Sequence, residues 1–372
     1  MRFKTATVSF LLILLTRVAI AGQVSPQLSP AKREKIEAVI SSFMSRQNIP
    51  ALSVAIVQNN EIRFQGAYGI ADLENLVPAK ASTVYRIAST SKPITAVAAM
   101  QLVEKGKLDL DAPVQKYAPT FPVKTFPITT RQLLAHLAGI RNYRRGEGER
   151  TNRYENLTEA LSIIKDDPLE SEPGTRFNYT TLGYILVGVI IEGASGMSYP
   201  EYMAKNILQP AGMQHTYVDD LFAIIPNRAH GYTPRVFGVL DGNYRNPILM
   251  DSSYKIPGGG WLSTAEDMAR FAIAVQNGVL IKPETFAEMS KSQKTKEGRE
   301  TGYGYGWYVG AFGGFSNSPD AVSHGGVQPG FTSNLVILPK QRFAVVILTD
   351  LEAGGRLDLG SLASQLTGIV LK

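Results

Sequence analysis

Apolar side chains recur at a helical spacing soon after residue 30. Four of them share one face of a helix predicted over residues 30–46: Ile36, Val39, Ile40 and Phe43. Two runs rich in β-branched residues follow at 51–57 and 61–69, and the Asn-Asn pair at 59–60 between them is typical of a hairpin turn. The pattern therefore predicts that an antiparallel sheet begins close to the N-terminus.

Helical patterns dominate the middle of the chain, and strand patterns return near its end. The late strands are predicted at 306–309, 331–338 and 343–348, before a closing helix over 361–370. Strands at both chain ends favour an α+β fold in which both ends complete one antiparallel sheet flanked by helices. We expect residues 22–88 with about 300–372 to form this discontinuous sheet domain, and 89–299 to form an inserted, mainly helical domain. The active site is expected between the two.

The first 21 residues have the features of an export signal. Arg2 and Lys4 form a charged start, and residues 8–15 form an apolar run that is short for a membrane span. The small residues at 19–21 suit cleavage before Gly22. We therefore expect a cleaved signal peptide, a periplasmic or secreted mature chain, and no stable membrane span after cleavage. The alternative is an uncleaved anchor.

Composition excludes several classes of site. The 372-residue chain contains no cysteine, which excludes disulfides, a thiol nucleophile and cysteine metal sites. Its net charge of +6 is spread along the sequence without a basic stripe, so we expect no nucleic-acid partner. The four histidines are widely separated and no His-Glu-x-x-His motif occurs, so we expect no metal and no other cofactor. The polar segment 141–153, which contains five arginines, is interpreted as an exposed loop.

A Ser-x-x-Lys motif at Ser89 and Lys92 is the first candidate for catalytic chemistry. Residues three apart share a helix face, so the Lys92 amine can meet the Ser89 hydroxyl and activate it as a nucleophile. Pro93 requires a helix to begin near residues 89–91, which leaves the Ser89 backbone N–H free to bind an anion. The spacing alone is weak evidence, because three other copies occur: Ser29/Lys32, Ser162/Lys165 and Ser252/Lys255.

Two later segments supply complementary groups. The segment 173–184 places Tyr179 in a loop that leads into a helix, where its phenol could serve as a base if neighbouring cations lowered its pKa. The segment 322–327 is bordered by glycines, and a substrate backbone could lie along its edge. In that segment the N–H of Val327 is predicted to pair with the N–H of Ser89 as an oxyanion hole.

Together these three segments resemble the penicillin-recognising serine hydrolases related to class C β-lactamases and D-Ala-D-Ala carboxypeptidases. Further stretches at 132–140, 258–271 and 303–307 are also similar to that family. The resemblance covers roughly residues 36–349, and the ordered combination of motifs is specific although each motif is weak. It implies a β-lactamase/transpeptidase-like fold.

The resemblance implies that Ser89 is the acylated nucleophile and that Lys92 and Tyr179 share proton transfer, with the choice of general base left open between them. Four residues of the third segment are implied to form the substrate and oxyanion side: His324, Gly325, Gly326 and Val327. For His324, substrate contact and a structural hydrogen bond stay as alternatives. His136 is interpreted as a structural residue that hydrogen-bonds a backbone group.

This chain departs from the class C pattern at two points. Thr181 stands where that branch has Asn, and His-Gly-Gly at 324–326 replaces Lys-Thr-Gly. In the family these groups help to hold the β-lactam side-chain amide and the carboxylate. Both departures therefore weaken the prediction of β-lactamase activity.

The sequence as a whole predicts an exported serine hydrolase that acts through a Ser89 acyl-enzyme on an amide, peptide or ester. Its partner would be a small-molecule or peptide substrate, and the oligomeric state is left open. The alternatives are a true class C-type β-lactamase and a non-catalytic binding or scaffold protein with the same fold. A Ser-His-Asp hydrolase lacks support, because no Gly-x-Ser-x-Gly motif occurs.

Overall fold

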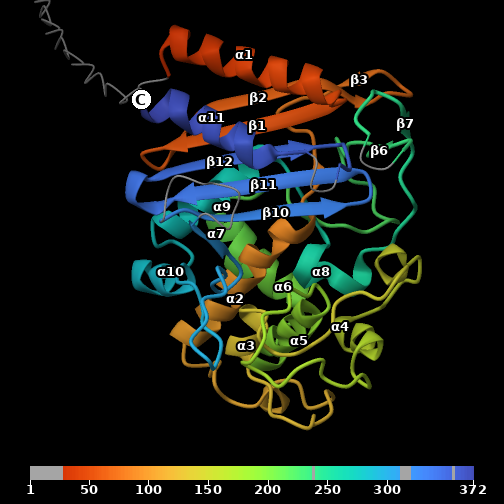
Figure 1. Cartoon of the computed structure of the whole chain (residues 1–372), viewed down its shortest axis with the longest axis vertical. Coiled ribbons are helices and arrows are strands. Elements are labelled where there is room, and N and C mark those ends of the chain that lie inside the picture. Colours follow the sequence, from red (N-terminus) through yellow and green to blue (C-terminus); the bar gives the residue numbers. More distant parts are fainter. Residues whose placement is uncertain (1–27, 237–238, 311–319, 354–356) are drawn as a thin grey trace, which may run out of the picture.

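A seven-stranded antiparallel sheet forms the upper part of the molecule (Figure 1). The computed structural model describes residues 28–236, 239–310, 320–353 and 357–372, so the predicted signal peptide lies outside the described residues. The strands of the sheet, in the order in which they lie side by side, are β3 (Val77–Pro78), β2 (Glu61–Asp72), β1 (Ala51–Gln58), β12 (Phe343–Thr349), β11 (Phe331–Leu338), β10 (Val322–Gln328) and β9 (Tyr308–Val309).

The two ends of the chain meet in the centre of this sheet. β1 pairs with β12 from Leu52 opposite Thr349 to Gln58 opposite Phe343. The residues between β1 and β2, Asn59 and Asn60, have positive φ angles of 54° and 62°, as a tight hairpin turn of this kind requires. The predicted α+β architecture, with one antiparallel sheet built from both chain ends, is therefore confirmed.

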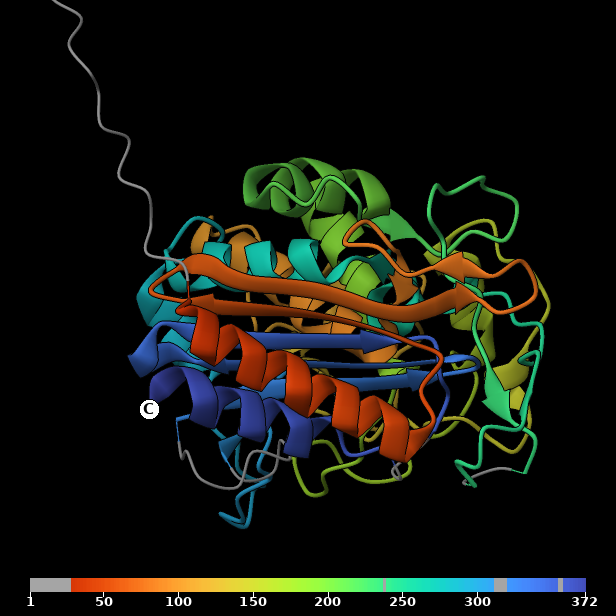
Figure 2. The same ribbon diagram turned by 90° about the horizontal axis from the view of Figure 1, so that it is seen from above.

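Helices cover both faces of the sheet. α1 (Pro30–Gln47) and α11 (Leu359–Leu371) contact each other and lie together on one face (Figure 2). The predicted apolar stripe of α1 is buried there, because Ile36, Ile40 and Phe43 pack in one cluster with Leu362 and Leu366 of α11. On the other face α9 (Ala265–Gln276) contacts β1 and β12.

The remaining helices lie below the sheet in Figure 1 and share its main hydrophobic core. They are α2 (Ser91–Glu104), α3 (Thr130–Leu134), α4 (Leu157–Ala160), α5 (Gly183–Ser195), α6 (Tyr199–Met203), α7 (Gln209–Ala211), α8 (Ile256–Gly259) and α10 (Pro283–Met289). Within the described ranges, none of the helices is both long enough and apolar enough to cross a membrane. The predicted division into two domains stays a prediction, since α9 belongs to the inserted segment yet packs on the sheet.

Small sheets within the middle of the chain were not predicted. One contains β4 (Tyr85–Arg86), β8 (Trp261–Ser263) and β5 (Tyr217–Val218), and the other pairs β6 (Thr233–Pro234) with β7 (Tyr244–Arg245). Strands of two or three residues are too short to show an alternating pattern. The first of these sheets matters for the site, because β4 leads directly into the segment that carries Ser89.

Candidate active site

Ser89 lies at a sharp bend between β4 and α2. One 3₁₀ turn, Ala88–Thr90, precedes the first residue of α2, and Ala88 has a φ of +47°. This left-handed conformation costs a residue with a side chain roughly 1–2 kcal/mol. Two hydrogen bonds hold the bend: Ser91 Oγ donates to the Ala88 carbonyl at 2.6 Å, and Ser333 Oγ donates to the Ile87 carbonyl at 2.7 Å. The strained bend therefore presents Ser89 at the start of the helix, as Pro93 predicted.

The buried side chain of Lys92 contacts three oxygen atoms. Its Nζ donates to Ser89 Oγ at 3.0 Å, to Thr181 Oγ1 at 3.1 Å and to the Gly258 carbonyl at 2.7 Å. Burial lowers the pKa of the Lys92 amine well below its usual value, and the neighbouring charge of Lys255 lowers it further. A lysine amine that is neutral over a wider pH range can accept a proton from Ser89.

Tyr179 shares a hydrogen bond with the Ser89 hydroxyl, and Lys92 Nζ lies 4.8 Å from the centre of its ring. Burial nevertheless raises the pKa of the Tyr179 phenol well above 10, and the hydrogen bond to Ser89 offsets only part of that rise. The condition under which Tyr179 could serve as the base, a pKa lowered by neighbouring cations, is therefore not met. Desolvation is the largest cause of the rise, and the neighbouring phenols of Tyr308 and Tyr184 raise the pKa further.

His136 packs against the ring of Tyr179. Its Nδ1 accepts the backbone N–H of Thr180 at 3.2 Å, and its ring centre lies 4.4 Å from that of Tyr179. Burial lowers the pKa of His136 well below its usual value, so the ring is neutral. The backbone hydrogen bond predicted for His136 is therefore present.

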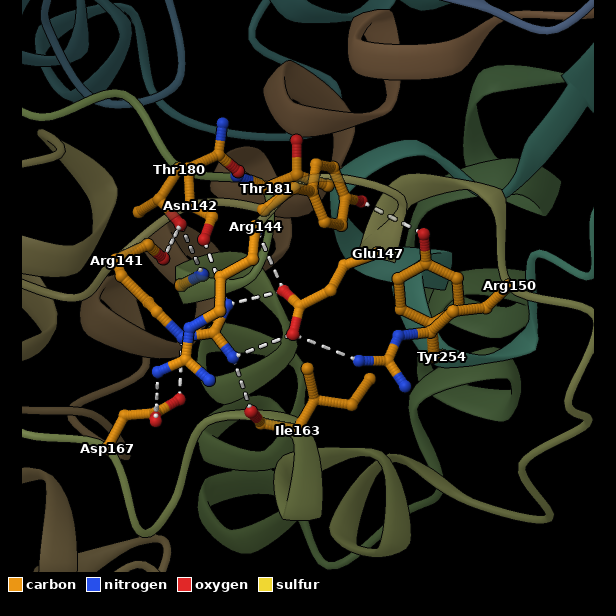
Figure 3. Close-up of polar contacts among 12 residues, drawn as sticks. Arg141, Asn142, Arg144, Glu147, Arg150, Ile163, Asp167, Thr180, Thr181 and Tyr254 are labelled. Carbon is orange, nitrogen blue, oxygen red and sulfur yellow. Dashed lines mark hydrogen bonds and ion pairs between the residues drawn. The ribbon is translucent and has the colours of Figure 1, made fainter.

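An ionic cluster anchors the segment that follows Tyr179 (Figure 3). Arg141 is only 5% exposed and pairs with Glu147 and Asp167, each at 2.6 Å. Its carbonyl accepts the Thr180 hydroxyl at 2.7 Å. The interpretation of 141–153 as an exposed loop is therefore wrong at Arg141, because two carboxylates and two carbonyls satisfy its guanidinium inside the protein.

The third segment forms β10, where His324 is 1% exposed. The ring hydrogen-bonds at both nitrogens: Nδ1 donates to the Gly325 carbonyl at 2.7 Å, and Nε2 accepts the Tyr303 hydroxyl at 3.0 Å. Burial first, and then the nearby Lys92, lower the pKa of His324 to about 3. His324 is therefore neutral, and both of its ring nitrogens form hydrogen bonds inside the protein.

The outer edge of β10 faces Ser89. The N–H of Gly310 donates to the Ala321 carbonyl at 2.8 Å, so Ala321 presents its backbone to the side where β9 lies. Backbone groups two residues apart in a strand point the same way, so Gly325 and Val327 face this side too. Among the described residues, β9 pairs with β10 only at Val322 and Ser323. The N–H of Val327 is therefore left available beside the nucleophile.

Gly326 allows β10 to approach Ser89 closely. A Cβ atom at this position would lie 2.4 Å from the Ile87 carbonyl oxygen, 2.6 Å from Ser333 Oγ and 2.9 Å from the Ser89 nitrogen. Such distances are shorter than any real Cβ contact, and two of the three neighbours are backbone atoms. Only glycine at 326 therefore lets the two predicted oxyanion donors lie side by side.

Gly326→Ala is expected to lower turnover about 100-fold, because β10 must move away from Ser89 and misplace the donors. The matched change Gly325→Ala should lose far less, since the nearest atom to its new Cβ is 3.7 Å away. Steady-state kinetics on both variants, with thermal melting as a check on folding, would measure the difference. Equal losses in the two variants would contradict the proposed role of this strand.

The described part of the chain contains no group of three or more His and acidic side chains placed to hold a metal ion. The side chains of Lys92 and Tyr179 and the backbone of Gly326 lie around Ser89. These come from α2, from the loop before α5 and from β10, three segments far apart in the sequence.

Comparison with known proteins agrees with this geometry. A sequence model of the family described as Beta-lactamase matches residues 36–363. The chain belongs to the β-lactamase family. The human serine beta-lactamase-like protein LACTB, mitochondrial, is 31% identical, over 78% of this chain and 69% of its own length.

Two solved structures show the same fold as this β-lactamase-family protein. D-amino acid amidase from Ochrobactrum anthropi SV3 matches with a TM-score of 0.79 and 21% identity, over 92% of this chain and 99% of the amidase. EstCE1, a hydrolase with promiscuous acyltransferase activity, matches with a TM-score of 0.76 and 23% identity, over 92% and 99%. The predicted β-lactamase/transpeptidase-like fold is confirmed.

Two hydrogen-bond partners of the Lys92 amine were not predicted from the sequence. The Thr181 hydroxyl was seen only as a departure from Asn, although it accepts a hydrogen bond from the amine. The Gly258 carbonyl contributes through its backbone, which leaves no signal in the residue type. The run of three glycines at 258–260 was the available clue, since glycine marks close backbone approaches.

Proposed function

We propose that this β-lactamase-family protein is a serine hydrolase that forms an acyl-enzyme at Ser89 on an ester, amide or peptide. The observation that carries the proposal is the contact of the buried Lys92 amine with Ser89 Oγ at 3.0 Å. The shared fold with an amidase and with an acyl-transferring hydrolase supports acyl chemistry in this scaffold.

In acylation, Lys92 Nζ takes the Ser89 proton while Oγ forms a bond to the substrate carbonyl carbon. The carbonyl oxygen gains negative charge and is bound by the N–H groups of Ser89 and Val327. The intermediate then breaks its bond to the leaving alcohol or amine, which receives the proton from Lys92 through the Tyr179 hydroxyl. Tyr179 suits this relay because its raised pKa keeps the phenol protonated.

Deacylation repeats these steps with water as the nucleophile. The Lys92 amine takes a proton from water while the water oxygen attacks the acyl carbon, and the same two N–H groups bind the oxyanion. The acyl–Oγ bond then breaks and Ser89 recovers its proton from Lys92. The enzyme returns to its starting state with a carboxylic acid released.

Two features favour esters and amides over β-lactams. Where the class C pattern has the lysine of Lys-Thr-Gly, the neutral, buried His324 supplies no cation for the carboxylate. Where that pattern has Asn, the Thr181 hydroxyl is engaged by Lys92. We therefore propose an esterase- or carboxypeptidase-like specificity.

A panel of substrates tests this proposal. Purified protein would be assayed with p-nitrophenyl acetate, p-nitrophenyl butyrate, a D-Ala-D-Ala peptide and nitrocefin at equal enzyme concentration. We expect kcat/KM for the esters to exceed that for nitrocefin. Efficient nitrocefin hydrolysis would overturn this ranking, and failure of every substrate to acylate the protein would overturn the proposed function.

A further inference from the structure

A cavity of about 240 Å³ lies beside the catalytic segment and has no role in the proposed acyl transfer. Arg86, on β4, lines it three residues before Ser89. Phe331, at the start of β11, also lines it and pairs with Gln328, the residue after Val327. The cavity therefore adjoins β4, which leads to Ser89, and the start of β11, which pairs with the end of β10 just beyond Val327.

Two arginines line this cavity and share one carboxylate. Arg86 Nε lies 2.9 Å from Asp219 Oδ2, and Arg228 Nη2 lies 3.8 Å from Asp219 Oδ1. The Asp219 side chain is fully buried, and its single negative charge is shared by both guanidinium groups. Two positive charges against one negative charge leave about one excess positive charge at the cavity wall.

Arg228 also has hydrogen-bonding capacity to spare. Its Nη2 donates to the Asp220 carbonyl at 2.8 Å, while the Asp220 carboxylate is paired with Arg153 at 2.9 Å. Its Nε is buried and has no hydrogen-bond partner. The Arg228 side chain as a whole is 26% exposed, so an anion would meet the accessible part of its guanidinium, where charge and hydrogen bonding both favour binding.

The other polar groups of the wall do not neutralise this charge. His230 Nε2 hydrogen-bonds Asn246 Oδ1 at 3.0 Å, which leaves that pair satisfied. Glu74 accepts a hydrogen bond from Asn246 Nδ2 at 3.0 Å but is not among the lining residues. Behind the wall, the buried amine of Lys255 contacts Met250 Sδ at 3.2 Å, and burial lowers its pKa to about 7. Lys255 does not line the cavity either, so the excess charge rests on the two arginines.

The remaining walls are apolar. Phe331, Met250 and Leu262 are buried, and the Arg86 guanidinium lies 5.8 Å from the centre of the Phe331 ring. Ile248 and Leu249 also line the cavity and are 48% and 66% exposed, which is unusual for such large apolar side chains. An apolar cavity with a few convergent polar groups is the common form of a small-molecule site.

We propose that this cavity binds a carboxylate ligand that carries an apolar segment, with the carboxylate at Arg228 and the apolar segment along Leu249. The ligand is either the far end of the substrate or a separate carboxylic acid. The first source rests on the proposed function of Ser89, whereas binding itself does not. One excess positive charge matches a single carboxylate better than a doubly charged phosphate.

Calorimetric titration of the full chain carrying Ser89→Ala tests binding without any acyl chemistry. The probe is hexanoate, with hexanamide as its neutral analogue. Adding Arg228→Gln should weaken hexanoate binding about tenfold and leave hexanamide unaffected, because only the charged ligand loses its partner. Arg270→Gln is the matched control, since Arg270 is a surface arginine paired with Glu266. Hexanoate binding that is absent, or equal in all variants, overturns the proposal.

A second variant guards against misfolding of Arg228→Gln. Leu249 is exposed, so Leu249→Ser should fold normally and weaken hexanoate more than acetate. If Leu249→Ser binds hexanoate and acetate with similar affinity at an unchanged melting temperature, the proposed contact of the apolar segment with Leu249 is supported. An unchanged ratio of hexanoate to acetate affinity overturns that contact.

Ester kinetics distinguish the two sources of the carboxylate. If it belongs to the substrate, the ratio of kcat/KM for mono-p-nitrophenyl glutarate to that for p-nitrophenyl butyrate should fall about tenfold in Arg228→Gln. An unchanged ratio with Arg228-dependent hexanoate binding supports a separate acid as the ligand. If neither ester is hydrolysed, ester substrates are excluded as the source of the carboxylate, and the hexanoate titration still decides the cavity.

Discussion

Ser89→Ala is expected to lower ester turnover by at least about 1,000-fold, because the acyl-enzyme cannot form without this oxygen. The contacts that make Ser89 reactive are specific to it: the Lys92 amine at 3.0 Å, the hydrogen bond with Tyr179 and the strained Ala88 before it. A residual rate over water would come from the oxyanion donors and from binding. Initial rates with p-nitrophenyl butyrate measure the loss.

The chain offers a matched control for this change. Ser162 and Lys165 have the same Ser-x-x-Lys spacing, but Ser162 is exposed on the surface. Ser162→Ala should therefore retain activity, and a fluorophosphonate probe should label Ser89 in that variant as in the parent. Labelling at another residue, or full activity of Ser89→Ala, would refute the assignment of the nucleophile.

Lys92→Met is expected to lower kcat/KM about 1,000-fold and to remove the rise of activity with pH. Since burial lowers the pKa of Lys92 well below 10.5, its neutral form accumulates as pH rises through that lowered value. The parent enzyme should therefore gain activity with increasing pH at values well below 10.5. A methionine fills similar space without a titrating group, so the rising limb should disappear.

Tyr179→Phe is the companion variant for this pH profile. Burial raises the pKa of Tyr179 well above 10, so the phenol acts as a proton relay and does not set the rising limb. The variant should be slower than the parent but should keep the limb. Loss of the limb in Tyr179→Phe and its retention in Lys92→Met would reassign the general base to Tyr179.

The sequence alone left the general base open between Lys92 and Tyr179. Both residues were found from motifs, but the lowered pKa on which a base role for Tyr179 depends is not present in the structure. A cation near a phenol lowers its pKa, but the depth of burial decides the direction of the shift for Tyr179. Burial depends on segments that the motif does not contain, such as His136 packed against the Tyr179 ring.

His324 gives a second example. Its place in a glycine-bordered strand left substrate contact and structural bonding as equal alternatives. The tertiary structure brings Tyr303, from outside the strand, to Nε2 and turns Nδ1 back to the next carbonyl, so both nitrogens are engaged. Such a pairing cannot be derived from spacing, because the two residues meet only when β10 joins the sheet.

Local chemistry is what the sequence by itself determined. The Asn59-Asn60 turn, the apolar stripe of α1 and the helix start required by Pro93 each depend on neighbours in the chain, and each is present in the structure. The Ser89–Lys92 contact belongs to the same class, because the 3₁₀ turn that runs into the start of α2 brings the two side chains together.

Only the tertiary structure decided how that pair is set for reaction. Gly258 and Thr181 approach Lys92 from distant segments, and Gly326 brings β10 against the Ser89 nitrogen. The cavity with Arg228 likewise forms only where separate loops meet beside β4. The physical reason is that desolvation, charge balance and backbone approach depend on which surfaces pack together, and a linear pattern does not contain that information.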